Sequence, residues 1–380
     1  MAKRYTSYFL GAFVSVAVTL ALLQAEAATP AVYIFGDSTL DVGTNVFIPE
    51  CLAKADVYFN GIDFPYSVPT GRFSNGLNTA DEIVRLLGWK RSPPPFLYLL
   101  NDKSTFKQNI LQGANFASGG SGIINTTGQT QFNRVISLED QIKQFSTVRS
   151  NITNMTGSDA ATDRILSKAF FLISIGSNDI LEYLLNLTTP PMSIPEFNVT
   201  LLSTYENHLK TLYDLGARTF GILAVPPIGC TPFARAVFTQ DGSCFEPAEQ
   251  FAQAFYVEVA ALLKQFSSAV QDIRYSLGNT YLMTTTMMED MLAFGFRNIA
   301  AACCGNGTYK CNQTASFCAN RDEYLFWDQF HPSQRASEMA ALTLFGASES
   351  LVAPMNFSQL LGVNVFRLFL YAFFEENESL

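Results

Sequence analysis

The chain has 380 residues, a formal net charge of −9 and a sequence pI near 4.8. Binding to phosphates needs basic faces, so this excess of acidic residues argues against a nucleic-acid partner. No Ser/Gly linker, charge block or internal repeat divides the chain, which favours one large domain.

The first predicted element is a leader over residues 1–27. Lys3 and Arg4 precede an apolar run over residues 8–23, and the small residues of AEA follow at 25–27. This pattern predicts a secretory signal peptide that is removed from the mature protein. A membrane anchor is the alternative, but the apolar run is short and a cleavage site follows it. We therefore expect a secreted, extracellular protein whose domain covers residues 28–362.

Two further features fit an extracellular protein. Nine Asn-x-Ser/Thr sequons are predicted glycosylation sites, at Asn125, Asn151, Asn154, Asn186, Asn198, Asn306, Asn312, Asn356 and Asn377. The seven cysteines lie mostly in the C-terminal half, which suits disulfides in an oxidising compartment.

The spacing of the cysteines leaves their pairing open. We expect the adjacent Cys303 and Cys304 to bond to different partners, Cys230 with Cys244 would close a short loop, and the isolated Cys51 is the candidate free thiol. A zinc site is the alternative, but the chain has no CxxC pair and only two histidines, so no metal site is predicted.

Short apolar runs alternate with helical patterns along the chain. Apolar runs of this kind, at residues 31–35, 114–117, 169–175, 219–225 and 280–283, are typical of strands in a parallel sheet covered on both faces. Starts at Pro and stops at Gly predict helices over residues 77–88, 200–215, 247–274 and 333–345. The alternation predicts an α/β fold, a three-layer α/β/α sandwich with a central parallel sheet.

Polar, Gly-rich segments follow the first four predicted strands. They read GDS, SGGSG, GSND and PPIG. Ligands of open α/β sheets bind at the carboxyl ends of the strands, so these segments are expected to lie along one edge of the sheet. Because Gly-rich turns end strands in any α/β protein, only their combination predicts an active site.

Ser38, in the segment GDS, is the predicted nucleophile. A serine hydroxyl needs a base to take its proton, and histidine suits that role near neutral pH. His208 lies in a predicted helix among polar neighbours, where a solvated or internally hydrogen-bonded histidine is the simpler interpretation. His331 follows Asp328 by three residues, a spacing at which the carboxylate can hold Nδ1–H and orient the imidazole. An aspartate there could equally cap the helix that begins at this point.

Donors for an oxyanion are predicted from three segments. They are the backbone N–H of Ser38, a glycine N–H in ASGGSG at residues 117–122, and the side-chain amide of Asn178. The alternative for Asn178 is a turn-forming role without catalysis.

Four segments in order, FGDSTLDVG, NFASGGSG, IGSND and DQFHPS, resemble the blocks of the plant secreted GDSL esterase/lipase family, a branch of the SGNH hydrolase superfamily. The resemblance runs over residues 31–361 and includes GRFSNG, VPPIGCTP and ACCG. It implies a flavodoxin-like SGNH hydrolase fold. It places the nucleophile on Ser38, the base on His331, the acid on Asp328, and the oxyanion donors on Ser38, Gly120 (with Gly119 as the alternative) and Asn178.

The resemblance further implies a serine esterase or lipase that hydrolyses carboxylic esters through an acyl-enzyme, with no cofactor and with a small-molecule or lipid ester as substrate. Two alternatives stay open. The acyl group could pass to another alcohol, as in cutin-type polyester synthesis, or the protein could be a catalytically silent extracellular binding or defence protein.

Three features depart from the family pattern. The segment MTTTMMED at residues 283–290 stands where the family commonly has an aspartate after the fifth strand. Thr44 stands where the family usually has asparagine in GNN. Residues 363–380 look like a C-terminal extension, and their apolar part is too short to cross a bilayer.

Overall fold

The computed structural model describes residues 29–187 and 191–363. The chain divides into two compact units, residues 1–30 and 31–380, and the fold below is that of the second unit. The predicted signal peptide and all but the first residue of the predicted extension lie outside the described residues.

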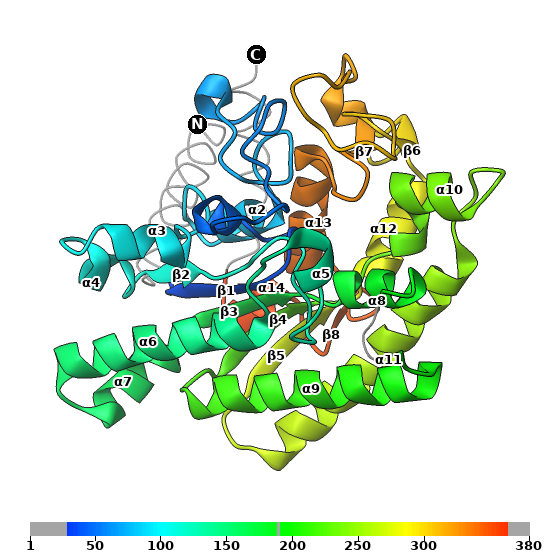
Figure 1. Ribbon diagram of the computed structural model, residues 1–380. Coiled ribbons are helices and arrows are strands. Elements are labelled where there is room, and N and C mark those ends of the chain that lie inside the picture. Colours follow the sequence, from blue (N-terminus) through cyan, green and yellow to red (C-terminus); the bar gives the residue numbers. More distant parts are fainter. Residues whose placement is uncertain (1–28, 188–190, 364–380) are drawn as a thin grey trace, which may run out of the picture. The chain divides into compact units, whose positions relative to one another are not determined.

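A six-stranded sheet in the order β2-β1-β3-β4-β5-β8 organises this unit (Figure 1). The bounds of its strands are β1 Val32–Gly36, β2 Gly113–Asn115, β3 Phe170–Ser174, β4 Thr219–Leu223, β5 Arg274–Gly278 and β8 Val352–Ala353. The first five strands are mutually parallel, and β8 adds an antiparallel edge. This order is that of flavodoxin-like sheets, in which the winding reverses between β1 and β3. The predicted α/β fold is confirmed, with β8 as an addition.

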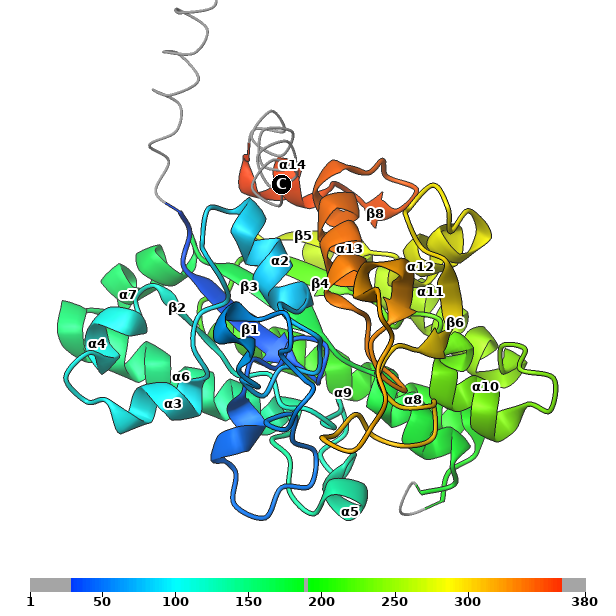
Figure 2. The same cartoon turned by 90° about the horizontal axis from the view of Figure 1, so that it is seen from above.

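Alternate residues of the strands belong to two separate cores. On β1, Tyr33 and Phe35 pack in a core with α6, α9 and α11, whereas Val32 and Ile34 pack in a core with α2, α13 and α14. The bounds are α2 Thr79–Leu86, α6 Leu138–Thr156, α9 Ile194–Asp214, α11 Glu246–Ala269, α13 Gln334–Gly346 and α14 Phe357–Leu361. In Figures 1 and 2, α6 and α9 lie on one side of the sheet and α2 and α13 on the other. Burial on both faces explains why β1 reads as a continuous apolar run.

Shorter elements complete the unit. They are α3 Phe96–Asn101, α4 Phe106–Asn109, α5 Gln129–Phe132, α7 Asp159–Leu166, α8 Ser177–Leu184, α10 Pro232–Phe238, α12 Thr280–Glu289, the paired strands β6 Asn298–Ala302 and β7 Tyr324–Phe326, and the 3₁₀ turns η2 Thr44–Phe47, η3 Pro65–Ser67, η4 Ile228–Cys230 and η5 Arg321–Glu323.

The strand expected at residues 280–283 is wrong, because these residues form the first turn of α12. The side chain of Asn279 accepts a hydrogen bond from the N–H of Leu282 and caps that helix. The fifth strand is β5, whose first residue is exposed and whose second is only partly buried, so it lacks a continuous apolar run. The predicted helix 247–274 accordingly ends at Ala269. Short apolar runs do not by themselves distinguish a strand from a helical turn.

Three disulfides join Cys230 to Cys244, Cys303 to Cys318 and Cys304 to Cys311, and Cys51 is a buried free thiol. The expectations for these cysteines are therefore confirmed. Among the helices of the described residues, none combines the length and apolar character needed to cross a membrane.

Candidate active site

The backbone places Ser38 at the point where the winding of the sheet reverses. β1 ends at Gly36, and a Cβ on Gly36 would lie 2.2 Å from the carbonyl oxygen of Ser174 at the end of β3. Gly36 also has a φ of +151°, so both contact and conformation require glycine. The next N–H, of Asp37, donates to the Ser174 carbonyl at 3.1 Å. Ser38 thus begins a turn at the carboxyl ends of β1 and β3, where α/β sheets bind ligands.

A continuous hydrogen-bond chain joins Ser38, His331 and Asp328. Oγ of Ser38 lies 2.8 Å from Nε2 of His331, and Nδ1 of His331 lies 2.8 Å from both carboxylate oxygens of Asp328. With a proton on Nδ1, Nε2 is left to accept the Ser38 hydroxyl proton. Ser38 and His331 lie 293 positions apart in the sequence. Together with Asp328, they have the geometry of a nucleophile, a base and an orienting acid.

The turn between β7 and α13 fixes the direction of the Asp328 carboxylate. Oδ1 of Asp328 accepts the backbone N–H groups of Phe330 and His331 at 2.9 and 2.8 Å. Helix α13 is capped by Ser333, whose Oγ accepts from the N–H of Ala336, so Asp328 is not the helix cap. Burial raises the pKa of Asp328, but the positive charge and hydrogen bond of His331 and the two backbone donors outweigh it, and this pKa lies below its ordinary value.

The predicted oxyanion donors line one cavity together with Ser38 and His331. The N–H of Gly119 is already used, because it donates to Oδ2 of Asp41 at 2.9 Å. Among the hydrogen bonds of the described residues, the N–H groups of Ser38 and Gly120 have no acceptor. Asn178, in the first turn of α8, donates through Nδ2 to the Ser121 carbonyl at 2.9 Å, which leaves its second N–H for a ligand. Of the two candidate glycines, Gly120 has the free donor.

Two buried carboxylates hold the loop that carries these donors, and the sequence did not reveal this role. Asp41 accepts the N–H groups of Gly43, Thr44 and Gly119. Asp179 accepts the N–H groups of Ile123 and Ile124 and the hydroxyl of Thr127. Burial raises the pKa of each carboxyl to about 6, although these hydrogen bonds oppose the shift. Asp41 lies in the segment FGDSTLDVG and Asp179 in the segment GSND. Their place in these two segments was the only sequence feature that could have pointed to this role.

Gln141 of α6 links the turn that carries Ser38 to the same loop. Its Oε1 accepts the N–H of Gly36 at 2.8 Å, and its Nε2 donates to the Gly36 carbonyl at 2.8 Å and to Oγ of Ser121 at 3.3 Å. The side chain is fully buried. It lies 105 residues from Gly36 in the sequence, and no local motif marks it.

The cavity that contains the site has a volume of about 620 Å³. Apolar side chains from α8, α10 and α12, including Leu181, Phe233 and Met287, line much of it. A cavity of this size, mostly apolar with a few converging polar groups, is typical of a site for a small-molecule or lipid substrate.

His208 and Thr44 are both buried, and neither belongs to the hydrogen-bond chain of Ser38, His331 and Asp328. His208 is buried on α9, its Nε2 lies 3.1 Å from the Ile123 carbonyl, and burial lowers its pKa. Thr44 is buried, its N–H donates to Asp41, and its Oγ1 has no hydrogen-bond partner among the described residues. Within the same part of the chain, no group of three or more His, Cys, Asp or Glu side chains could hold a metal ion.

The predicted glycosylation sites differ in exposure. Asn125, Asn154, Asn186 and Asn306 are exposed, Asn151, Asn198, Asn312 and Asn356 are partly buried, and Asn377 lies outside the described residues. Asn356 also caps α14, and its Nδ2 donates to the Ala347 carbonyl at 3.0 Å. A glycan on Asn356 would compete with that contact, and glycosylation of the chain stays a prediction.

Comparison with known proteins identifies the family. The family model described as GDSL-like Lipase/Acylhydrolase matches residues 32–344. GDSL esterase/lipase LTL1 of Arabidopsis thaliana is 33% identical over 92% of this chain and 95% of that protein. GDSL esterase/lipase At2g23540 of the same plant is 34% identical over 86% of this chain and 87% of that protein, and GDSL esterase/lipase At1g71250 is 35% identical over 89% and 91%. The chain therefore belongs to the GDSL-like lipase/acylhydrolase family.

Proposed function

We propose that this protein is a secreted serine esterase that hydrolyses carboxylic esters through an acyl-enzyme on Ser38. The observation that carries the proposal is the hydrogen-bond chain from Asp328 through His331 to Ser38, with 2.8 Å between Nε2 and Oγ. A catalytically silent protein has no need for this chain to stay complete. Family membership and the three disulfides support a secreted hydrolase of the esterase or lipase kind.

In the first half-reaction, Oγ of Ser38 attacks the carbonyl carbon of the ester while Nε2 of His331 takes the hydroxyl proton. Asp328 keeps Nδ1 protonated and stabilises the imidazolium that forms. The tetrahedral intermediate then collapses, the bond to the alcohol oxygen breaks, and that oxygen receives the proton from Nε2. The acyl group remains on Ser38.

In the second half-reaction, water attacks the acyl carbon as Nε2 takes its proton. The carboxylic acid leaves and Ser38 regains the proton. In both halves the negative charge on the carbonyl oxygen is stabilised by the N–H groups of Ser38 and Gly120 and by the amide of Asn178. The two backbone donors have no acceptor among the hydrogen bonds of the described residues, so they need not break a bond to serve.

The test compares Ser38→Ala with a matched control, Ser177→Ala. Ser177 lines the same cavity but makes no hydrogen bond to His331. On a short-chain p-nitrophenyl ester, Ser38→Ala should lower kcat by about 10³-fold or more, and Ser177→Ala should keep most of the activity. Retained turnover in Ser38→Ala, with an unchanged circular dichroism spectrum, contradicts the proposal.

A further inference from the structure

The triad and the oxyanion donors give no role to the motif GRFSNG at residues 71–76. Its aromatic residue, Phe73, lines the catalytic cavity. The centroid of its ring lies 4.8 Å from the centroid of the His331 imidazole, with 35° between the ring planes. Phe73 is therefore in direct contact with the face of the proposed base.

The same ring also contacts the loop that carries the oxyanion donor. A Cβ built on Gly119 would lie 2.6 Å from Cε2 and 2.7 Å from Cζ of Phe73. Gly119 is held by Asp41 through its N–H and by Asn45 through its carbonyl, at 2.9 and 2.8 Å. The Phe73 ring thus fills the space between His331 and the residue that precedes Gly120.

A contact on the face of the imidazole supplies a restraint that the triad hydrogen bonds lack. Asp328 and Ser38 contact His331 through Nδ1 and Nε2, the two ring nitrogens, whose proton and lone pair point outward in the plane of the ring. Such bonds leave the ring free to tilt about the line through the two nitrogens. A packed aromatic ring against the face opposes that tilt, because close-packed side chains tolerate little displacement.

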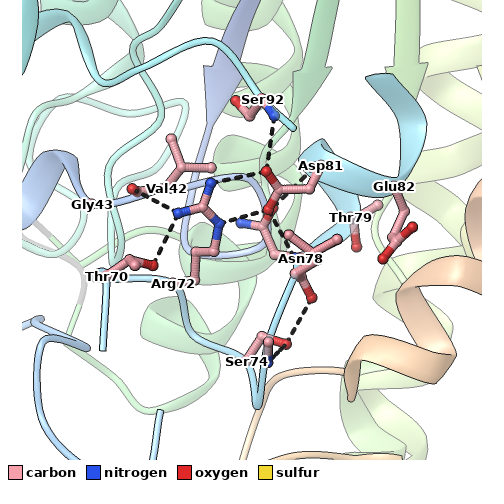
Figure 3. Close-up of polar contacts among 12 residues, drawn as sticks. Val42, Gly43, Thr70, Arg72, Ser74, Asn78, Thr79, Asp81, Glu82 and Ser92 are labelled. Carbon is pink, nitrogen blue, oxygen red and sulfur yellow. Dashed lines mark hydrogen bonds and ion pairs between the residues drawn. The ribbon is translucent and has the colours of Figure 1, made fainter. Parts of the chain in front are cut away.

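A buried ion pair anchors the chain just before Phe73 (Figure 3). Arg72 binds Asp81 of α2 with two hydrogen bonds, from Nε at 2.6 Å and Nη2 at 2.9 Å. Its Nη1 donates to Oγ1 of Thr70 at 2.9 Å and to the carbonyl of Val42 at 3.4 Å. Arg72 therefore joins the motif to α2 and to the turn that follows Ser38.

The chain just after Phe73 is anchored to the helix that follows His331. Oδ1 of Asn75 accepts the N–H of Gln334, the first residue of α13, at 2.8 Å. The side chain of Gln334 in turn accepts the N–H of Leu77 at 2.8 Å. Phe73 is thus fixed from one side to the nucleophile turn and from the other to the segment that carries the base.

We propose that Phe73 is a positioning residue, which holds the imidazole of His331 in line with Ser38 and holds the oxyanion loop at Gly119. The inference rests on the proposed esterase function. It gives the GRFSNG motif the role of keeping His331 aligned with Ser38. Phe73 does not react, so its removal should slow the chemical steps without removing any reacting group.

The test replaces Phe73 with leucine and with tyrosine. Phe73→Leu keeps an apolar side chain but removes the flat ring, and we expect kcat on a p-nitrophenyl ester to fall about 10- to 100-fold, since misplacement by about 1 Å has this effect. KM should change by less than about twofold, because binding of the ground state is not the main loss. Phe73→Tyr keeps the ring and should retain kcat within about threefold.

Phe233→Leu is the matched control. Phe233 lines the same cavity but packs on Phe330 and Phe238, so its loss should affect KM more than kcat. Thermal unfolding of each variant shows whether the fold is intact. An unchanged Tm together with a lower kcat indicates misalignment of His331, whereas a lower Tm indicates damage to the fold.

The inference is overturned if Phe73→Leu keeps kcat within about twofold, if its loss appears in KM alone, or if Phe73→Tyr is as impaired as Phe73→Leu. These outcomes count when the parent protein turns over the ester and Ser38 reacts with a fluorophosphonate. A parent that does neither contradicts the proposed function instead.

Discussion

Two neighbouring carboxyls on α2, Asp81 and Glu82, should respond in opposite ways to removal of their charge. Asp81 is fully buried and accepts four hydrogen bonds from Arg72, the N–H of Asn78 and the N–H of Ser92 (Figure 3). Burial acts to raise the pKa of Asp81, but the charge and hydrogen bonds of Arg72 outweigh it, so the pKa lies below its ordinary value. Asp81→Asn leaves Arg72, a residue that is only 5% exposed, without its counter-charge.

Breaking a buried pair in this way lowers the free energy of unfolding by about 3–5 kcal/mol. Because the folded pKa of Asp81 lies below its unfolded value, its stabilisation is present above the unfolded pKa of about 3.9 and is lost only as pH falls through the lower folded value. The cost of Asp81→Asn should therefore appear in full at both pH 5 and pH 8.

Glu82 has the opposite pH dependence. Burial raises its pKa from 4.5 to about 8, against the attraction of Arg85 and together with repulsion from Glu338 and Asp81. The folded protein therefore holds this proton more tightly than the unfolded chain does, and stability falls as pH rises from 4.5 to about 8. At about 1.4 kcal/mol per pKa unit, the upper limit of that fall is roughly 5 kcal/mol. Glu82→Gln removes it.

The assay is urea unfolding at pH 5 and pH 8, without reductant, followed by tryptophan fluorescence. We expect Glu82→Gln to match the parent near pH 5 and to be at least as stable at pH 8, and Asp81→Asn to be less stable at both. Equal losses in the two variants, or a Glu82→Gln penalty that grows with pH, would refute the reasoning about burial and pairing.

Three further variants and one double variant test the site and its supports. Asp328→Asn should lower kcat by roughly 10³- to 10⁴-fold with little change in KM, measured on a p-nitrophenyl ester. Asn178→Ala should lower kcat by about 10²- to 10³-fold in the same assay, because it removes one of the three proposed oxyanion donors. Thr44→Val should leave the free energy of unfolding, measured by urea titration, unchanged or raise it by up to about 1 kcal/mol, since the threonine hydroxyl has no partner among the described residues. Replacing Cys230 and Cys244 by serine opens a 14-residue separation and should cost about 3 kcal/mol in urea unfolding.

Much of the fold could be predicted because its signals are local. Strands β1, β3 and β4 are apolar runs that contribute to both cores, and the helices begin and end at Pro, Ser and Gly. The fifth strand could not be predicted in the same way. It begins at the exposed Arg274, so its burial depends on β4 and β8, which the sequence of the strand does not reveal.

In the candidate site too, some residues could be predicted from the sequence and others could not. Ser38, Asp328 and His331 could be proposed as a triad because ester hydrolysis by a serine requires those residue types and the chain has only two histidines. The supports could not be named, because their partners are distant. Gln141 reaches Gly36 across 105 residues. Phe73 and His331 lie in distant parts of the sequence, and only the folded chain brings their rings into contact.

The central claim is that Ser38 is a nucleophile activated by His331. The most direct measurement is peptide mass mapping of the full-length protein after treatment with a fluorophosphonate. We predict one adduct, on the peptide that contains Ser38, and strongly reduced labelling in His331→Ala with the fold preserved. An adduct on another serine, no adduct at all, or undiminished labelling of Ser38 in His331→Ala would contradict the account.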